Sequence, residues 1–305
     1  MLVLLNKMLL FLVLMALGYL GARKGLLKPD FTKGLSWLTM SVLLPATILN
    51  AVFSASSGLS LGEIGQVLGV FAFAFAFCYA LGYLATRLLR RKGERAPVFE
   101  LLVSGMNSMF VGLPVLQALY PGNQQVVLYM AISCLPFNFI LFSYGVWRLR
   151  GGGHGAVRWR DMLSPPMLTT LLALPLLLLH PPIPAVLREI TGAIAGATVP
   201  MSMIVIGSSL GKVKLSRALT DGSLYLASLF RLLLAPVLCF LVLDRLPIDS
   251  VLEHAAIITV ACPSATLVSI LAIQYGKDAE YASEGVLLST ALSMLTIPAL
   301  VALLL

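Results

Sequence analysis

Two prolines lie in apolar stretches that are long enough to cross a membrane, and small polar residues flank both of them. Pro114 lies in ELLVSGMNSMFVGLPVLQALY, and Pro263 lies in AAIITVACPSATLVSILAIQY. A proline removes one backbone hydrogen bond from a helix and clashes with the preceding turn. In hydrocarbon, the freed backbone groups are tolerated only where they face protein or a water-lined cavity. The pattern predicts two broken helices near the membrane midplane, whose N-terminal ends suit a carboxylate and whose carbonyl ends suit a cation.

The polar residues beside these prolines are candidate substrate ligands. Asn107 and Ser108 precede Pro114, and an asparagine donates and accepts hydrogen bonds, so it can hold a carboxylate or stabilise loose backbone. Ser264 and Thr266 follow Pro263, where their hydroxyls can meet a substrate or bond back to the preceding turn. Serine also packs commonly between membrane helices, which makes two further serines weaker candidates. These are Ser41 and Ser202.

Arg231 is the one basic residue that we expect deep in a membrane span, because it lies about 20 Å along a helix from Arg217. A charge at such depth indicates a function by default. Arg231 can pair with a substrate carboxylate or replace a coupling cation. It can also cap the carbonyls of a broken helix or extend outward to the interface. By contrast, we expect Glu100 and Glu284 near the membrane interface.

The composition indicates that the helices carrying these residues lie in a membrane. Of the 305 residues, 59% are hydrophobic and 11% are charged, and the mean hydropathy is +0.96. No soluble domain has this composition, and an α-helical membrane domain fits it. At about 20 residues per crossing, we predict ten helices. They cover roughly 4–22, 34–54, 63–90, 98–119, 124–148, 163–180, 185–210, 219–243, 252–275 and 281–304.

The basic residues follow this topology rather than forming a nucleic-acid surface, despite the formal charge of +8. All but four of the 21 lysines and arginines fall on loops of one side, which the positive-inside rule makes cytoplasmic. Both termini then face outward from the cell's plasma (inner) membrane. The first span is not a signal peptide, because positive charge follows it and no cleavage site is evident. The four cysteines have no metal-ligand spacing, and no metal or cofactor is expected.

The basic connection at 151–162 divides the chain into two halves, 1–150 and 163–305, of five helices each. An odd number of spans per half gives the halves opposite orientations, so a shared fold would form an inverted repeat. Two proline pairs at similar offsets support this: Pro45 with Pro200, and Pro114 with Pro263. The alternative is chance, since prolines are common in membrane helices.

Several motifs resemble the auxin efflux carrier family, the PIN-like transporters, in a small bacterial form. GYLGARKGLLKPDFTKGLSWLTMSVLLPATILN is similar to the family's first two helices, and NSMFVGLPVLQALYP is similar to its fourth. LPFNFILFSYGVW, VPMSMIVIGSSL and RLLLAPVL resemble its fifth, seventh and eighth helices. The resemblance covers nearly the whole chain. More distantly, the chain resembles the bile acid–sodium symporters.

The resemblance implies a ten-helix fold in which helices four and nine cross at Pro114 and Pro263, with a scaffold and a transport bundle that move relative to each other. It implies alternating-access transport of small organic anions, auxin-like or malonate-like, and a homodimer. It also associates Asn138 with the substrate pocket, although an asparagine there can simply bond between helices.

Three alternatives stay open. A sodium-coupled symporter of the bile acid type is one, but ACPSATLVS lacks the Glu and Gln that those relatives place near the crossing. A membrane enzyme would need paired acidic residues or a His/Glu metal set, and no such pair lies at a predicted helix end. A non-transporting sensor is the third. The sequence has no P-loop, so ATP does not drive the protein directly.

Overall fold

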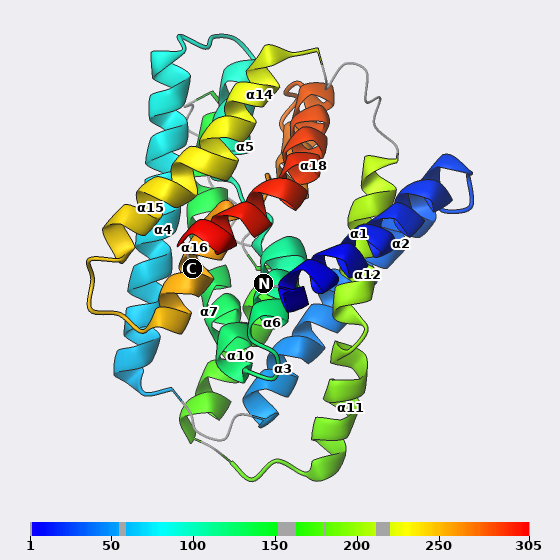
Figure 1. Cartoon of the computed structure of the whole chain (residues 1–305), viewed down its shortest axis with the longest axis vertical. Coiled ribbons are helices and arrows are strands. Elements are labelled where there is room, and N and C mark those ends of the chain that lie inside the picture. The colour runs from blue at the N-terminus through cyan, green and yellow to red at the C-terminus, as the bar shows by residue number, and fades with distance from the viewer. Residues whose placement is uncertain (1, 55–58, 152–162, 180, 212–219, 305) are drawn as a thin grey trace. The chain divides into compact units, whose positions relative to one another are not determined.

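The computed structural model describes residues 2–54, 59–151, 163–179, 181–211 and 220–304, and every named element in these ranges is a helix (Figure 1). The first half contains α1 (Leu2–Arg23), α2 (Pro29–Leu38), η1 (Thr39–Leu43), α3 (Leu44–Ser54), α4 (Leu61–Leu88), α5 (Arg95–Ser104), η2 (Ser108–Gly112), α6 (Leu113–Leu119), α7 (Gln124–Ile140), η3 (Leu141–Gly145) and α8 (Val146–Leu149). The second half contains α10 (Pro165–Leu179), α11 (Ala185–Ala195), α12 (Thr198–Leu210), α14 (Gly222–Leu229), η4 (Phe230–Leu234), α15 (Ala235–Leu243), α16 (Ser250–Ala261), α17 (Thr266–Gln274) and α18 (Ala279–Leu304).

Each of the ten predicted ranges is occupied by one helix or by consecutive helices. Within the described residues, six helical stretches are long and apolar enough to cross a membrane. These are Asp30–Ser54, Leu61–Leu88, Gln124–Leu149, Ala185–Leu210, Gly222–Leu243 and Ala279–Leu304. η1, η3 and η4 are π-helical turns inside three of these stretches, and η2 begins the shorter apolar helix Ser108–Leu119.

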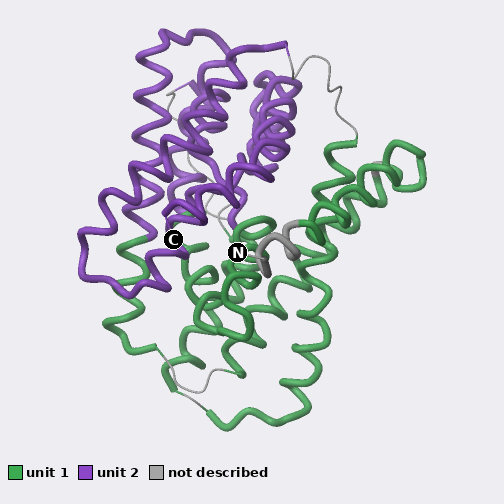
Figure 2. The backbone as a smooth tube through the Cα atoms, in the orientation of Figure 1, with its two compact units in different colours: residues 1–70, 109–138, 163–212 green, residues 71–108, 139–162, 213–305 purple. Residues whose placement is uncertain are grey.

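The chain forms two compact units, and each unit takes segments from both halves of the sequence (Figure 2). Unit 1 comprises Met1–Val70, Met109–Asn138 and Leu163–Lys212; unit 2 comprises Phe71–Ser108, Phe139–Met162 and Val213–Leu305. The halves 1–150 and 163–305 are therefore not the compact units, and an inverted repeat relating them stays a prediction. Most of the expected linker at 151–162 lies outside the described residues.

Within unit 1, the surroundings of Pro45 and Pro200 contact each other. The hydroxyls of Thr47 and Thr198 lie 2.8 Å apart, and Thr198 Oγ1 also donates to the carbonyl of Leu43 at 3.1 Å. All three residues are buried. The two prolines paired in the sequence thus mark segments that pack together through hydrogen-bonded threonines.

Helices α1 and α12 approach each other so closely in unit 1 that only glycine fits. A Cβ added at Gly207 would lie 1.9 Å from the carbonyl oxygen of Met15. We expect Gly207→Ala to lower the free energy of unfolding by about 1–3 kcal/mol, because backbone rather than a flexible side chain must shift. Gly65→Ala is the matched control: nothing lies within 4 Å of its added Cβ, and alanine should stabilise that helix by roughly 0.5–1 kcal/mol. Denaturant unfolding in detergent measures both; equal effects would contradict the close approach.

Three of the four π-helical turns in the described ranges end two residues before a proline. They are η1 before Pro45, η2 before Pro114 and η4 before Pro236. Proline has no N–H for the carbonyl four residues earlier, and its ring clashes with that carbonyl. In a π turn, carbonyls bond five residues ahead instead, as Leu44 N–H donates to Thr39 and Ala235 N–H donates to Phe230. The turn therefore accommodates the proline without ending the helix.

This explains why the break expected at Pro114 lies elsewhere. Pro114 lies inside the helical stretch Ser108–Leu119, and the chain leaves helical conformation at 105–107 instead. The second break covers 262–265, around Pro263, as expected. The position predicted for the first break was therefore wrong by about two turns.

Candidate functional site

The two breaks meet each other inside unit 2. The N–H of Asn107 donates to the carbonyl of Pro263 at 2.8 Å, and the N–H of Ala265 donates to the carbonyl of Gly105 at 3.1 Å. Met106 and Ser264 form an antiparallel bridge between these bonds. The backbone groups that leave their helices thus bond one another, as buried peptide groups must.

A glycine opens the first break because the two segments come close there. A Cβ on Gly105 would lie 3.0 Å from the carbonyl of Leu101 and 3.1 Å from Cγ2 of Val268 on α17. Ser264 fixes the other segment: its hydroxyl donates to the carbonyl of Leu102 at 2.6 Å, and its N–H donates to Ser289 Oγ at 3.1 Å. Ser289, on α18, was not among the predicted residues.

Arg231 bonds the carbonyl ends of both broken helices. Its Nε donates to the carbonyl of Cys262 at 2.9 Å, and its Nη2 donates to that of Val260 at 2.5 Å. Its Nη1 donates to the carbonyls of Val103 at 3.1 Å and Ser104 at 3.5 Å. The side chain is fully buried. Because the C-terminal end of a helix carries a partial negative charge, the guanidinium compensates the ends of α5 and α16 together. Of the roles that the sequence allows for Arg231, this contact is the one in which it caps the carbonyls of a broken helix.

The N-terminal end of α17 has no side-chain cap. It begins after Ala265, whose methyl group accepts no hydrogen bond. Elsewhere in unit 2, Asp221 caps α14 by accepting from Ser223 N at 2.9 Å, and Asp249 caps α16 by accepting from Leu252 N at 3.1 Å. The helix that starts at the break therefore lacks a side-chain acceptor, as α5 does, whereas α14 and α16 have one.

Asn107 and Ser108 lie buried beside the first break, with exposed fractions of 7% and 5%. In the described part of the chain, neither side chain has a hydrogen-bond partner. Asparagine is a preferred helix cap, yet this one does not use its amide that way. Side-chain donors that the fold itself does not bond are available to a ligand.

The two hydroxyl residues of α17 differ from expectation. Thr266, predicted as a ligand, is exposed, whereas Ser269, one turn later, is 8% exposed and its buried Oγ lacks a partner in the described residues. Ser269 was not predicted. The signal that could have found it is its spacing of three residues from Thr266, which puts both on one helix face.

The remaining predicted residues lie in unit 1. Asn138 is buried and its Nδ2 donates to the carbonyl of Cys134 at 2.8 Å and to Ser164 Oγ at 3.3 Å. Ser202 is fully buried, and its Oγ has no hydrogen-bond partner in the part of the chain that the structure describes; Ser41 is half-buried in η1. Pro114 is buried in α6. Unit 2 therefore contains Asn107, Ser108, Pro263, Ser264 and Arg231 at the paired breaks, and Thr266 at the start of α17.

A buried ion pair in unit 2 holds Glu100, one of the two glutamates expected near the membrane interface. Glu100 is fully buried and accepts two bonds from Arg148 Nε, at 3.0 and 2.9 Å, and one from Nη2 at 2.5 Å. The hydroxyl of Tyr144 donates to the same carboxylate at 2.6 Å. Glu284 is also buried, with 6% exposed. Because a bidentate arginine and a tyrosine satisfy it, the Glu100 carboxylate needs no water.

No group of three or more His, Cys, Asp or Glu side chains with metal-site geometry occurs among the described residues. The four cysteines are buried and unpaired. The chemistry of the paired breaks is therefore that of backbone dipoles, amides and hydroxyls.

Comparisons with known proteins agree on the kind of protein. The profile of a family described as membrane transport protein matches residues 3–156 and 154–301. An uncharacterized transporter of Methanothermobacter thermautotrophicus is 27% identical over 299 residues, covering 94% of each chain. An uncharacterized transporter of Methanocaldococcus jannaschii is 25% identical over 303 residues, covering 96% of each chain.

Proposed function

The chain belongs to the membrane transport protein family, that of the auxin efflux carriers, and from this premise we propose that it carries small organic anions across the plasma membrane by alternating access. The family and the six apolar helical stretches make it a multi-pass membrane protein. The proposal extends this to the substrate class, and the uncapped start of α17 beside the unpartnered amide of Asn107 is the observation that carries it.

The chemistry of the paired breaks favours a carboxylate. The first N–H groups of α17 present a partial positive charge to whatever occupies the break. The Asn107 amide can donate to the same carboxylate, and Ser108 and Ser269 offer further hydroxyl donors. All of these donors are neutral groups. The protein therefore binds the anion without a further charged side chain, which would be costly in a membrane if it were unpaired.

In this proposal Arg231 supports the site and does not bind the substrate. Its donors are occupied by carbonyls of α5 and α16. By compensating the negative ends of these helices, it leaves the positive end of α17 as the dominant charge at the break. Arg231 thereby takes the place that a coupling cation would otherwise fill at the carbonyl ends.

The same arrangement favours a uniporter or an anion exchanger over a sodium symporter. The segment 262–265 supplies no carboxylate or amide side chain for sodium, and its carbonyl ends face Arg231. We assign the role of transport bundle to unit 2, which contains the paired breaks, and the role of scaffold to unit 1. Termini outside the cell and a homodimer complete the proposal.

Transport in proteoliposomes tests the proposal. Uptake of malonate and indole-acetate is measured as labelled substrate, with and without anion inside, so that electroneutral exchange is also detected. We expect Asn107→Ala to reduce uptake at least tenfold, because the carboxylate loses a buried donor worth about 1.5–3 kcal/mol. The fold should persist, since the amide has no partner to lose.

Asn123→Ala is the matched control, because Asn123 only accepts from Gln125 N in an exposed loop. It should transport like the wild type. If Asn107→Ala transports as well as the wild type, Asn107 is not a substrate ligand. If neither carboxylate is transported by the folded wild type nor raises its unfolding temperature, the organic-anion proposal is wrong.

A further inference from the structure

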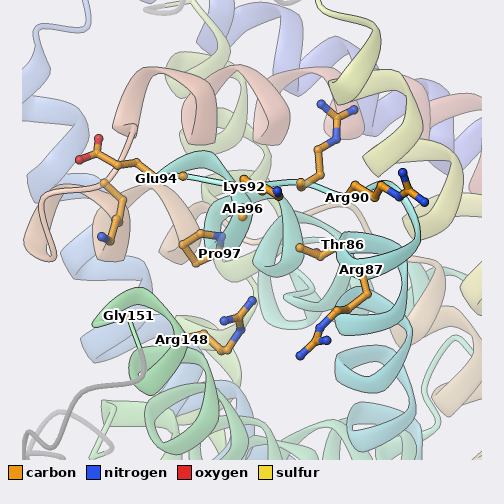
Figure 3. Close-up of a pocket in the computed structure, with 12 residues that line it drawn as sticks. Thr86, Arg87, Arg90, Lys92, Glu94, Ala96, Pro97, Arg148 and Gly151 are labelled. Atoms are coloured by element: carbon orange, nitrogen blue, oxygen red, sulfur yellow. The ribbon is translucent and has the colours of Figure 1, made fainter.

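A second, basic pocket lies where α4 gives way to α5, within unit 2 and outside the paired breaks. It has a volume of about 540 Å³, which is in the range of ligand pockets. Six basic residues line it: Arg87, Arg90, Arg91, Lys92, Arg148 and Lys277. Glu94 is the one acidic residue in its lining. Figure 3 shows Arg87 and Arg148 extending toward one another from α4 and α8.

The protein neutralises the neighbouring arginines but not the other pocket cations. Arg148 is paired with Glu100, as described above. Arg95, just beyond the pocket, donates to Asp278 at 2.7 Å and lies 3.5 Å from Asp221. In the described residues, no ion pair reaches Arg87, Arg90, Arg91, Lys92 or Lys277. Five cations therefore share one carboxylate, that of Glu94.

Asp278 shows how a neighbouring arginine changes the pKa of a carboxyl group. Its partial burial raises the pKa of the carboxyl, but the N–H of Tyr281 and the Arg95 guanidinium outweigh this and hold the pKa below its usual value. A carboxylate is thus stabilised wherever the fold brings one to an arginine at this end of unit 2. The pocket offers the same stabilisation to an anion from outside the chain.

Aromatic rings hold two of the free guanidinium groups in place without cancelling their charge. Arg87 lies over the ring of Tyr83, with 5.0 Å from Cζ to the ring centroid, and Arg91 lies over Phe99 at 5.3 Å. The Nε of Arg91 is buried and has no hydrogen-bond partner in the described residues. An oriented, desolvated donor of this kind is costly unless a ligand bonds to it.

The pocket rim includes the left-handed turn that ends α4, where the N–H of Arg91 donates to the carbonyl of Thr86 at 3.0 Å. Arg90 has φ of +49°, the left-handed region that favours glycine, and a non-glycine residue there is uncommon. A glycine at position 90 would make the turn without strain, as Gly93 does with φ of +72°. The substitution Arg90→Gly would therefore remove the charge and keep the turn.

We propose that this pocket binds a phosphate-bearing anion, either a soluble phosphate compound or the headgroup of an anionic phospholipid. The planar forks of several arginines match phosphate oxygens in geometry and supply several charges at once. The positive-inside rule accounts for the positive charge of the residues that line this pocket, which we expect on the cytoplasmic side. It does not account for a pocket, for the stacked guanidinium groups or for the buried Nε of Arg91, which has no partner in the described residues. Basic pockets on that side of a membrane suit phosphate headgroups.

The test uses the full-length protein in lipid nanodiscs and follows its unfolding temperature. One arm adds sodium pyrophosphate to phosphatidylcholine nanodiscs; the other replaces part of the phosphatidylcholine with phosphatidylglycerol. We expect one arm to raise the unfolding temperature. The variant Arg90→Gly/Lys92→Gln changes two exposed side chains and relieves the turn, so it should fold. It should lose that stabilisation, with half-saturation shifted about tenfold or more.

Lys24→Gln/Lys28→Gln is the matched control, since it removes two exposed charges expected on the same side of the membrane. It should respond like the wild type. A response to pyrophosphate alone identifies a soluble phosphate ligand, and a response to phosphatidylglycerol alone identifies a headgroup. The proposal is overturned if neither arm stabilises the wild type, or if both double variants respond equally.

Discussion

Arg231→Met is expected to lower the free energy of unfolding by about 3–5 kcal/mol, the largest effect of any single substitution proposed for this protein. Methionine fills much of the volume but donates nothing. The carbonyls of Val103, Val260 and Cys262 then lose their donor while they stay buried. The two helix ends also lose the charge that compensates their dipoles. Denaturant unfolding of the purified protein in detergent measures the change.

Two further variants separate this role from substrate binding. Arg231→Lys keeps the charge but not the planar fork that reaches two helix ends, so most of the loss should persist. Arg245→Gln, at an exposed site after α15, should change stability by no more than about 0.5 kcal/mol. If Arg231→Met folds with wild-type stability and loses only anion uptake, the arginine is a substrate ligand and the capping role is wrong.

Glu100→Gln is expected to lower the free energy of unfolding by about 3 kcal/mol, because it leaves Arg148 without its counter-charge. We place the loss at the lower end of the range for buried pairs, since the Arg148 side chain is 23% exposed and water can solvate part of it. Tyr144 also loses the carboxylate that accepts from its hydroxyl.

A double-mutant cycle isolates the pair. Arg148→Met alone should be strongly destabilising, because it strands the fully buried carboxylate. The combined Glu100→Gln/Arg148→Met variant should recover much of either loss, giving a coupling energy of at least about 1 kcal/mol. Glu94→Gln, an exposed carboxylate one residue before α5, serves as the control. Additive single effects would show that Glu100 and Arg148 act independently.

The helical segments could be predicted from the sequence because hydropathy and charge are local properties. Runs of about 20 apolar residues separated by basic loops define them, and each predicted range is occupied by one helix or by consecutive helices. The second break could be predicted for the same reason, since Pro263 and its polar neighbours lie at the break itself.

The first break could not be located because its cause is not local. Pro114 has the stronger helix-breaking character, but a π turn accommodates it. Gly105 and Asn107 leave the helix because Pro263 and Ala265, far along the chain, supply the bonds that replace helical ones. Burial of Glu100 was missed for the same reason, since Arg148 and Tyr144 make it tolerable. Asn107, Ser264 and Arg231 could be singled out from the sequence. That Ser264 and Arg231 bond the backbone of the breaks, while the Asn107 side chain has no partner among the described residues, could not.

The long separation between α5 and its partners has a consequence for biogenesis. Val103 O and Arg231 are 128 residues apart in sequence, which a ribosome takes about 6–25 s to synthesise at typical rates. During that interval the carbonyl end of α5 has left the ribosome without the arginine that later satisfies it. A nascent transporter of this kind has reason to remain beside the insertion machinery until α14–α17 arrive, rather than entering lipid helix by helix.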